Sequence, residues 1–159
     1  MLPKQSLKTK AFTLIELMVV ISIIAVLSGG SLVAFNNLRE KRQVRADADL
    51  VVQELKKART KARSGEKPEA CISDLGGYEV EMSGSSVVLR VNCGNTIDDN
   101  SVQLQNSSIV GTEEVEFDAL GGATPATIYV CGSSSSYGYA VEVTGSGLIE
   151  APVEYALCS

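Results

Sequence analysis

The chain changes character at the stretch Lys10-Ala11-Phe12-Thr13-Leu14-Ile15-Glu16-Leu17, where a short cationic leader ends and a long apolar run begins. The run from Phe12 to Phe35 has 24 residues, and about 20 apolar residues in a helix are enough to cross a bilayer. It contains one ionisable side chain, Glu16. Because a carboxylate in a membrane helix costs about 2.5–3.5 kcal/mol on insertion scales, Glu16 needs a specific explanation.

Two ordinary interpretations of the leader and the apolar run stay open. A secretory signal peptide also has a basic region followed by an apolar one. However, this run contains an acid, Ala25-Val26-Leu27 lacks the small-x-small pattern of a cleavage site, and Ser28-Gly29-Gly30 matches it only weakly. The other interpretation is a plain membrane anchor with an incidental Glu. Lys4, Lys8 and Lys10 precede the run and predict that the leader stays in the cytoplasm and that the rest lies outside the inner membrane.

Residues 12–27, with the sequence Phe-Thr-Leu-Ile-Glu-Leu-Met-Val-Val-Ile-Ser-Ile-Ile-Ala-Val-Leu, resemble the N-terminal signature of type IV pilins and type II secretion pseudopilins. In that family a prepilin peptidase cuts before the Phe and methylates its new amine. The resemblance therefore implies cleavage between Ala11 and Phe12 and N-methylation of Phe12. The family usually has Gly where this chain has Ala11, and Ala is the next smallest side chain.

The resemblance also gives Glu16 a role. In the family, the new α-amine is thought to pair with the Glu carboxylate of a neighbouring subunit. A cationic partner offsets the cost of a carboxylate in apolar surroundings, so a pair between Phe12 and Glu16 would set the register of subunits in a filament. The alternative is that Glu16 pairs with the Phe12 amine of its own chain, which satisfies the charge but does not explain register.

The whole chain is expected to have an α+β fold, with one long N-terminal helix packed on an antiparallel sheet. The expected parts are a cleaved cytoplasmic leader at 1–11, a single membrane-spanning and filament-core helix half at 12–35, an amphipathic helix half at 36–65, and a β-rich head at 66–159. Gly29-Gly30 is either a weak point of the helix or a place of close helix packing.

The amphipathic half is predicted from an apolar stripe with spacings of three and four residues. The stripe consists of Val44, Ala48, Val51, Leu55, Ala58 and Ala62. The opposite side carries Arg42, Arg45, Asp49, Lys56, Arg59 and Arg63. Ser64-Gly65 and then Pro68 predict the end of the helix near residue 63.

The sequence of the head predicts strands separated by turns. Residues 77–82 and 86–91 flank Ser83-Gly84-Ser85 and predict a hairpin, and further strands are expected near 101–105, 108–112, 114–118, 126–131 and 137–144. Gly145-Ser146-Gly147 predicts a turn after the last of them. Asp98-Asp99-Asn100 is interpreted as a solvated turn, with calcium binding as a weaker alternative because the spacing lacks a loop pattern.

Charge is unevenly distributed along the chain. Residues 39–67 have ten Lys or Arg and five Asp or Glu, whereas residues 68–159 have one Arg and thirteen acids. Packing of an acidic head against a basic helix half of a neighbouring subunit is one interpretation, and solvation of both is the other. With one Arg and no Lys beyond residue 67, the head is not expected to bind nucleic acid.

The four cysteines allow three pairings in an outside-facing domain. We favour Cys71 with Cys93, because they flank the predicted hairpin, and Cys131 with Cys158, which would close a C-terminal loop as in many pilins. The cysteines are far apart in sequence and the chain has no His, so neither a zinc site nor a His-activated nucleophile is expected. Ser133 to Ser136 is interpreted as a polar turn, and we expect no enzyme activity, metal or cofactor.

A second resemblance concerns the subgroup. It is carried by Leu55-Lys56-Lys57-Ala58-Arg59, by Phe117-Asp118-Ala119-Leu120-Gly121-Gly122 and by Val143-Thr144-Gly145-Ser146-Gly147, which look like the H-type pseudopilin and related minor pilins. That subgroup often has Arg where this chain has Leu148. The resemblance implies a minor pilin or pseudopilin of a type IV pilus or type II secretion filament, whose partners are the prepilin peptidase, other pilin subunits and the inner membrane. The alternatives are a membrane-anchored filament-tip protein whose head binds a partner, and a major pilin.

Overall fold

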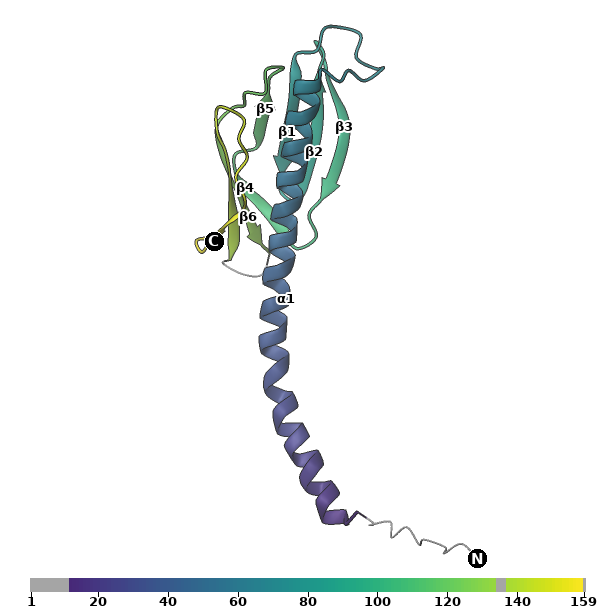
Figure 1. Cartoon of the computed structure of the whole chain (residues 1–159), viewed down its shortest axis with the longest axis vertical. Coiled ribbons are helices and arrows are strands. Elements are labelled where there is room, and N and C mark those ends of the chain that lie inside the picture. The colour runs from purple at the N-terminus through teal and green to yellow at the C-terminus, as the bar shows by residue number, and fades with distance from the viewer. Residues whose placement is uncertain (1–11, 134–136, 159) are drawn as a thin grey trace, which may run out of the picture. The chain divides into compact units, whose positions relative to one another are not determined.

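The computed structural model of the chain describes residues 12–133 and 137–158, and its described side chains exclude residues 28–34 and 37. The leader, Ala11 and residues 134–136 of the expected polar turn therefore lie outside the described residues. The chain divides into two compact units, one up to Leu38 and one from Arg39 to Ser159. In the described residues, one helix is followed by eight strands. Figure 1 labels the helix and the strands β1 to β6.

The helix α1 (Leu14–Ser64) has recognisable signals at both ends. Thr13 precedes it and accepts a hydrogen bond on Oγ1 from the backbone N–H of Glu16 at 3.3 Å, as an N-cap residue does. At the other end Gly65 has a φ of 63°, and the N–H groups of Gly65 and Glu66 donate to the carbonyls of Ala62 and Lys61. This is the Schellman arrangement, which favours Gly because of the left-handed backbone. The predicted N-terminal helix is confirmed, and Ser64 and Gly65 lie at its end as the sequence predicts.

The second unit is built around the predicted apolar stripe of α1. Its six members are all fully buried: Val44, Ala48, Val51, Leu55, Ala58 and Ala62. They form one core with inward-facing side chains of the strands, including Val80 and Leu89 on one sheet and Ile128 and Val141 on the other. The prediction of a helix stripe laid on the head is therefore confirmed.

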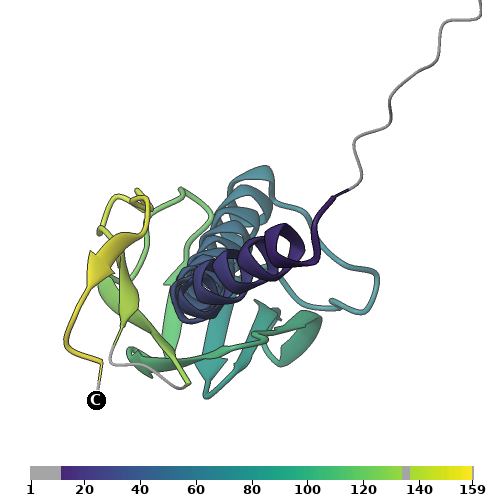
Figure 2. The same ribbon diagram turned by 90° about the horizontal axis from the view of Figure 1, so that it is seen from below.

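The head has two four-stranded antiparallel sheets. The first has the order β3-β2-β1-β5 and consists of β1 (Gly77–Ser83), β2 (Ser86–Asn92), β3 (Thr96–Gln103) and β5 (Glu114–Phe117). The second has the order β4-β6-β7-β8 and consists of β4 (Ser107–Gly111), β6 (Ala126–Gly132), β7 (Gly138–Val143) and β8 (Val153–Tyr155). In Figure 2 the strands of the first sheet are largely teal and lie along one side of the helix. The yellow-green strands beside them belong to the second sheet.

Strand alternation places the first sheet with one face on α1 and the other away from it. On β1, Tyr78, Val80 and Met82 are buried while the residues between them are less so. Because successive side chains of a strand point to opposite faces, Glu79 and Glu81 lie on the outer face. The same alternation holds on β5, where Val115 is buried and Glu114 and Glu116 are exposed.

Most of the expected strands are present in the described residues. The hairpin pairs Ser83 with Ser86, so Gly84-Ser85 forms its turn, as predicted. The short strand β8 was not expected, because Val153–Tyr155 has only three residues and forms a strand by pairing with β7.

The interpretation of Asp98-Asp99-Asn100 as a solvated turn is wrong. The strand expected near 101–105 begins at Thr96, and these three residues form its middle. Both carboxylates have cationic partners: Asp98 pairs with Arg90 at 2.8 Å and Asp99 with Lys61 at 3.0 Å. These pairs, and the ladder with β2, explain why a polar segment is held extended.

Candidate assembly site

Phe12 and Thr13 directly precede α1, and Glu16 lies in its first turn. Glu16 occupies the third helical position, and Thr13 with Glu16 has the spacing of a capping box. A carboxylate here also interacts favourably with the partial positive charge of a helix N-terminus. The Glu16 carboxylate makes no ion pair with any described residue. The backbone of Glu16 therefore takes part in capping the helix.

The first turns of α1 present apolar side chains to their surroundings. Every residue from 12 to 27 is exposed, and among these Phe12, Leu14 and Ile15 are each more than 70% exposed. A contiguous exposed apolar surface of this kind marks contact with a membrane or another protein. Within the described residues, no helix meets the combined length and hydropathy requirement for crossing a membrane. The membrane-spanning segment expected at 12–35 stays a prediction.

In the second unit, Asp47 joins α1 to the loop between β3 and β4. It is buried, and its carboxylate accepts hydrogen bonds from the Ser107 hydroxyl at 2.6 Å and from the backbone N–H groups of Asn106 at 3.0 Å and Gln105 at 3.4 Å. The role of Asp47 was not predicted from the sequence. Its spacing could have indicated burial, because Asp47 follows Val44 by three positions and precedes Val51 by four, and therefore lies beside the apolar stripe of the helix.

Near its C-terminal end, α1 meets two turns of the head. A Cβ on Gly147 would lie 2.1 Å from the Gly121 carbonyl oxygen and 3.0 Å from Arg59 Nε, and Gly147 has a φ of +74°. Arg59 also donates to the Ser146 carbonyl at 3.3 Å. The three segments that carry the subgroup resemblance therefore contact one another at this junction.

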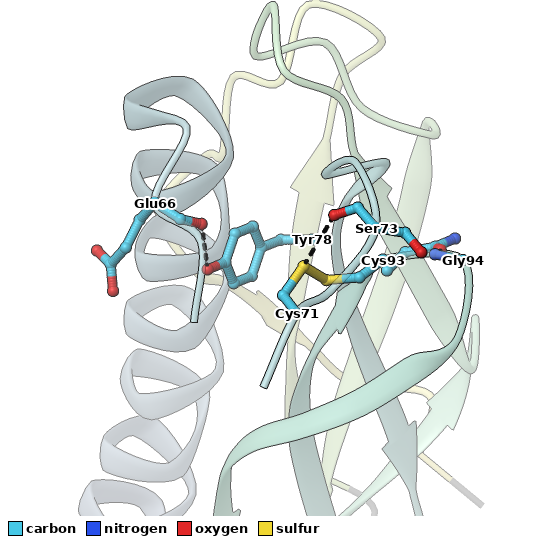
Figure 3. Close-up of a disulfide and its surroundings, with 7 residues drawn as sticks. Glu66, Cys71, Ser73, Tyr78, Cys93 and Gly94 are labelled. Atoms are coloured by element: carbon cyan, nitrogen blue, oxygen red, sulfur yellow. Dashed lines mark hydrogen bonds between the residues drawn. A yellow bond between two sulfur atoms is a disulfide. The ribbon is translucent and has the colours of Figure 1, made fainter. Parts of the chain in front are cut away.

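Lys61, on another side of α1, links the helix to β3 and to the segment after the helix. It pairs with Glu66 at 2.7 Å and with Asp99 at 3.0 Å. The hydrogen bond to Glu66 and the charge of Asp99 hold the pKa of Lys61 well above its ordinary value, although burial acts in the opposite direction. The Tyr78 hydroxyl donates to the Glu66 carbonyl at 2.8 Å, so the segment after the helix is held on the sheet as well (Figure 3).

Two disulfides are present, Cys71–Cys93 and Cys131–Cys158. These are the two pairs that the sequence analysis favours. The first ties the segment after α1 to the end of β2, and Figure 3 shows it beside Tyr78. The second joins β6 to the C-terminal segment beyond β8, where its sulfur lies so close to Gly138 that a Cβ there would be 2.4 Å from Cys158 Sγ.

Peptide mapping of the native protein under non-reducing conditions is expected to find Cys71–Cys93 and Cys131–Cys158. Both pairs have Cα separations, 5.5 and 5.6 Å, that suit a disulfide. An oxidising compartment outside the inner membrane would let them form. Free thiols at these positions, or either of the other two pairings, would contradict both the connectivity and the expected location of the head.

The outer face of the first sheet carries a concentration of negative charge. Glu79 is the cross-strand partner of Glu116, and Glu81 is that of Glu114. The carboxylate oxygens of Glu79, Glu114 and Glu116 lie within 4.8 Å of one another. Burial, with the nearby Glu114 and Glu116 carboxylates, raises the pKa of Glu79 above its ordinary value, while Arg90 acts in the opposite direction. Like charges placed directly opposite on two strands are destabilising.

Arg90 on β2 is the cross-strand partner of Glu79 and brings a positive charge next to these acids. It pairs with Glu81, with Glu79 at 3.8 Å and with Asp98 at 2.8 Å. One guanidinium therefore serves three carboxylates, and neither Glu114 nor Glu116 makes an ion pair with any residue in the described part of the chain.

Comparison with known proteins identifies the N-terminal segment. Residues 7–32 match the prokaryotic N-terminal methylation motif. The motif spans Phe12 and Glu16, and it supports the type IV pilin and pseudopilin family. It implies processing by a prepilin peptidase, anchoring in a membrane and assembly with other pilin-type subunits, and the family is one of structural subunits rather than enzymes. No curated protein and no solved structure matches the chain.

Proposed function

We propose that the chain is a minor pilin or pseudopilin, a structural subunit of a type IV pilus or type II secretion filament. It enters the inner membrane through residues 12–35, loses residues 1–11 to a prepilin peptidase, and is methylated on the Phe12 amine. The observation that carries this proposal is the methylation motif over residues 7–32. The exposed apolar side chains of residues 12–27 support it, because neighbouring helices of a filament would cover them.

The minor, H-type role has its own support. The segments 55–59, 117–122 and 143–147 resemble that subgroup, and Gly121, Gly147 and Arg59 pack together at one junction. Residues distant in sequence thus form one local structure, whose close backbone approach requires Gly at 147. The alternatives are a major pilin and a tip protein whose head binds a partner.

Intact mass spectrometry of the protein from cells with an active prepilin peptidase tests the processing step. We expect a chain that begins at Phe12 and carries one added methyl group. A matched sample from cells without the peptidase should retain residues 1–11. Recovery of only the full-length chain from both would count against a pilin-type subunit, and a cut near Ser28–Gly30 would instead favour an ordinary signal peptide.

A further inference from the structure

We propose that the outer face of the second sheet binds a saccharide chain through the Tyr129 ring and the polar side chains beside it. The ligand class is an uncharged oligosaccharide, whose sugar rings have apolar C–H faces and a rim of hydroxyl or acetamido groups. The outer face offers apolar and polar groups in neighbouring rows, as such a ligand requires. The proposal goes beyond the filament function above and does not depend on it.

An apolar row crosses all four strands of the second sheet. Val110 pairs with Tyr129, Tyr129 with Ala140, and Ala140 with Val153. Side chains directly opposite each other on antiparallel strands share a face. The two residues that flank Tyr129 on β6 are fully buried in the core, so the row faces away from the core, and Val110 and Val153 are 52% and 63% exposed. The row spans three gaps between neighbouring strands, or about 14 Å, which suits a chain of sugars rather than a single one.

The Tyr129 ring is flanked by Tyr155 and Gly111. Its centroid lies 4.5 Å from that of Tyr155, with an interplanar angle of 36°. A Cβ on Gly111 would lie 3.2 Å from Tyr129 Cδ2, and the φ of +106° at this position also favours Gly. The missing side chain leaves this side of the ring uncovered. An aromatic face carries partial negative charge and attracts the C–H groups of a sugar ring.

A hollow of about 640 Å³ adjoins Tyr129 where β6 begins. Its polar lining includes Thr112, Thr127 and Glu142, and the last two are cross-strand partners. The Thr112 hydroxyl donates to the Thr127 carbonyl at 3.3 Å. In the part of the chain that the structure describes, the Thr127 and Tyr129 hydroxyls and the Glu142 carboxylate have no hydrogen-bond or ion-pair partner. Hydroxyls donate and accept, whereas a carboxylate only accepts, so together these groups match the hydroxyls of a sugar.

The charges of this face disfavour other ligand classes. The strands of the second sheet contain no Lys or Arg, so they offer no cation to a phosphate or another anion. A purely apolar ligand would bury the polar groups of Thr127 and Glu142 without partners, which is unfavourable. A cationic segment would meet Glu142 and the Tyr129 ring, and it is therefore the competing ligand in the test.

Calorimetric titration of the full chain tests the ligand class. The protein is kept in a zwitterionic detergent, because detergents with sugar headgroups share the chemistry of the ligand. The probes are cellohexaose and chitohexaose, the β-linked hexamers of glucose and of N-acetylglucosamine, with hexalysine as the competing cation. We expect saturable binding of at least one saccharide with a dissociation constant below about 1 mM. Binding of chitohexaose alone would indicate an acetylated glycan of the cell-wall type, and binding of cellohexaose would indicate an unacetylated polysaccharide.

Substitutions on the outer face separate the contributions of the ring and of the polar groups. Tyr129→Ala removes the ring and is expected to weaken saccharide binding about tenfold. Tyr129→Phe keeps the ring and should weaken binding less than Tyr129→Ala. Thr127→Val and Glu142→Gln each replace one hydrogen-bonding group with little change of shape, and each should weaken binding about threefold.

Tyr137→Ala and Glu69→Gln are the matched controls. Tyr137 packs against the core, with Lys41 Nζ of α1 4.2 Å from its ring centroid. Glu69 is exposed on the segment after the helix. Both variants should bind the saccharide like the wild type. Both disulfides and an unchanged circular dichroism spectrum establish that each variant has folded, so a loss of affinity then reports on the ligand contact.

Three results would overturn the proposal. The first is no binding of either saccharide at millimolar concentration, and the second is equal binding by Tyr129→Ala and the wild type. The third is binding of hexalysine alone, which would assign the outer face to a cationic segment of another protein. None of these results bears on cleavage or methylation of the leader, so failure of this proposal is distinguishable from failure of the proposed function.

Discussion

Replacing Glu16 with Ala is expected to yield protein that enters the membrane normally but joins filaments poorly. Removing a carboxylate from an apolar helix does not hinder insertion, since an acid there costs about 2.5–3.5 kcal/mol. In a filament, however, the change leaves the Phe12 amine of a neighbour without its partner. Breaking a buried pair in this way costs roughly 3–5 kcal/mol. The ratio of filament-associated to membrane-bound protein, compared with wild type, measures the effect.

The capping position of Glu16 calls for a control. The Glu16 backbone N–H donates to Thr13 Oγ1, and a capping box also accepts Gln at the position of Glu16. Glu16→Gln therefore preserves local capping and removes the charge. If Glu16 acts by pairing with an amine, Gln should fail as Ala does. If Gln assembles like wild type while Ala does not, the role of Glu16 is local helix capping.

If both Glu16 variants show the same ratio of filament-associated to membrane-bound protein as wild type, Glu16 does not set the register of subunits. The result also depends on where the subunit lies in the filament. A subunit at the tip has no neighbour ahead of it, so its own Glu16 would have no amine to pair with. A strong effect of Glu16→Ala therefore favours a subunit inside the filament.

The helix was predictable because local signals agree along its length. The apolar run begins at Phe12, Ser64-Gly65 ends the helix, and the stripe from Val44 to Ala62 has one period throughout. The first hairpin was predictable for a similar reason, since two alternating segments flank Gly84, whose φ of 55° suits the turn. These features depend on neighbours within a few residues of each other, which is the range over which sequence patterns are informative.

The features that were missed depend on contacts far apart in the sequence. The segment 96–100 is polar, and it is a strand because β2 pairs with it and because Arg90 and Lys61 bind its two aspartates. The strand β8 is three residues long and exists through pairing with β7. The division into two sheets is likewise a matter of strand order, which alternation along single strands does not specify.

The charge asymmetry was visible in the sequence, but its arrangement was not. Counting acids and bases shows a basic helix half and an acidic head. It does not show that Glu79 and Glu116 face each other across two strands, because residues 84–113 lie between β1 and β5 in the chain. Nor does it show that Lys61 pairs with both Asp99 and Glu66, which lie on β3 and on the segment after the helix.

Replacing Asp47 with Ala is expected to destabilise the head by about 3 kcal/mol. Hydrogen bonds to charged groups contribute about 1.5–3 kcal/mol each and are not additive when they share an acceptor. The change leaves the buried Ser107 hydroxyl and the N–H groups of Asn106 and Gln105 without their acceptor. Denaturant unfolding of the full chain in detergent, followed by tyrosine fluorescence, gives the free energy of unfolding, because all five Tyr lie in the head.

Asp49→Ala is the matched control for this change. It truncates the same kind of side chain two residues further along α1, where Asp49 is about half exposed and pairs only with Arg45 at 3.5 Å. An exposed pair four residues apart contributes about 0.3–0.5 kcal/mol, so this variant should unfold close to wild type. Equal, small losses in both variants would show that Asp47 does not fasten the helix to the loop between β3 and β4. A large loss confined to Asp47→Ala would show that one buried carboxylate holds the two together.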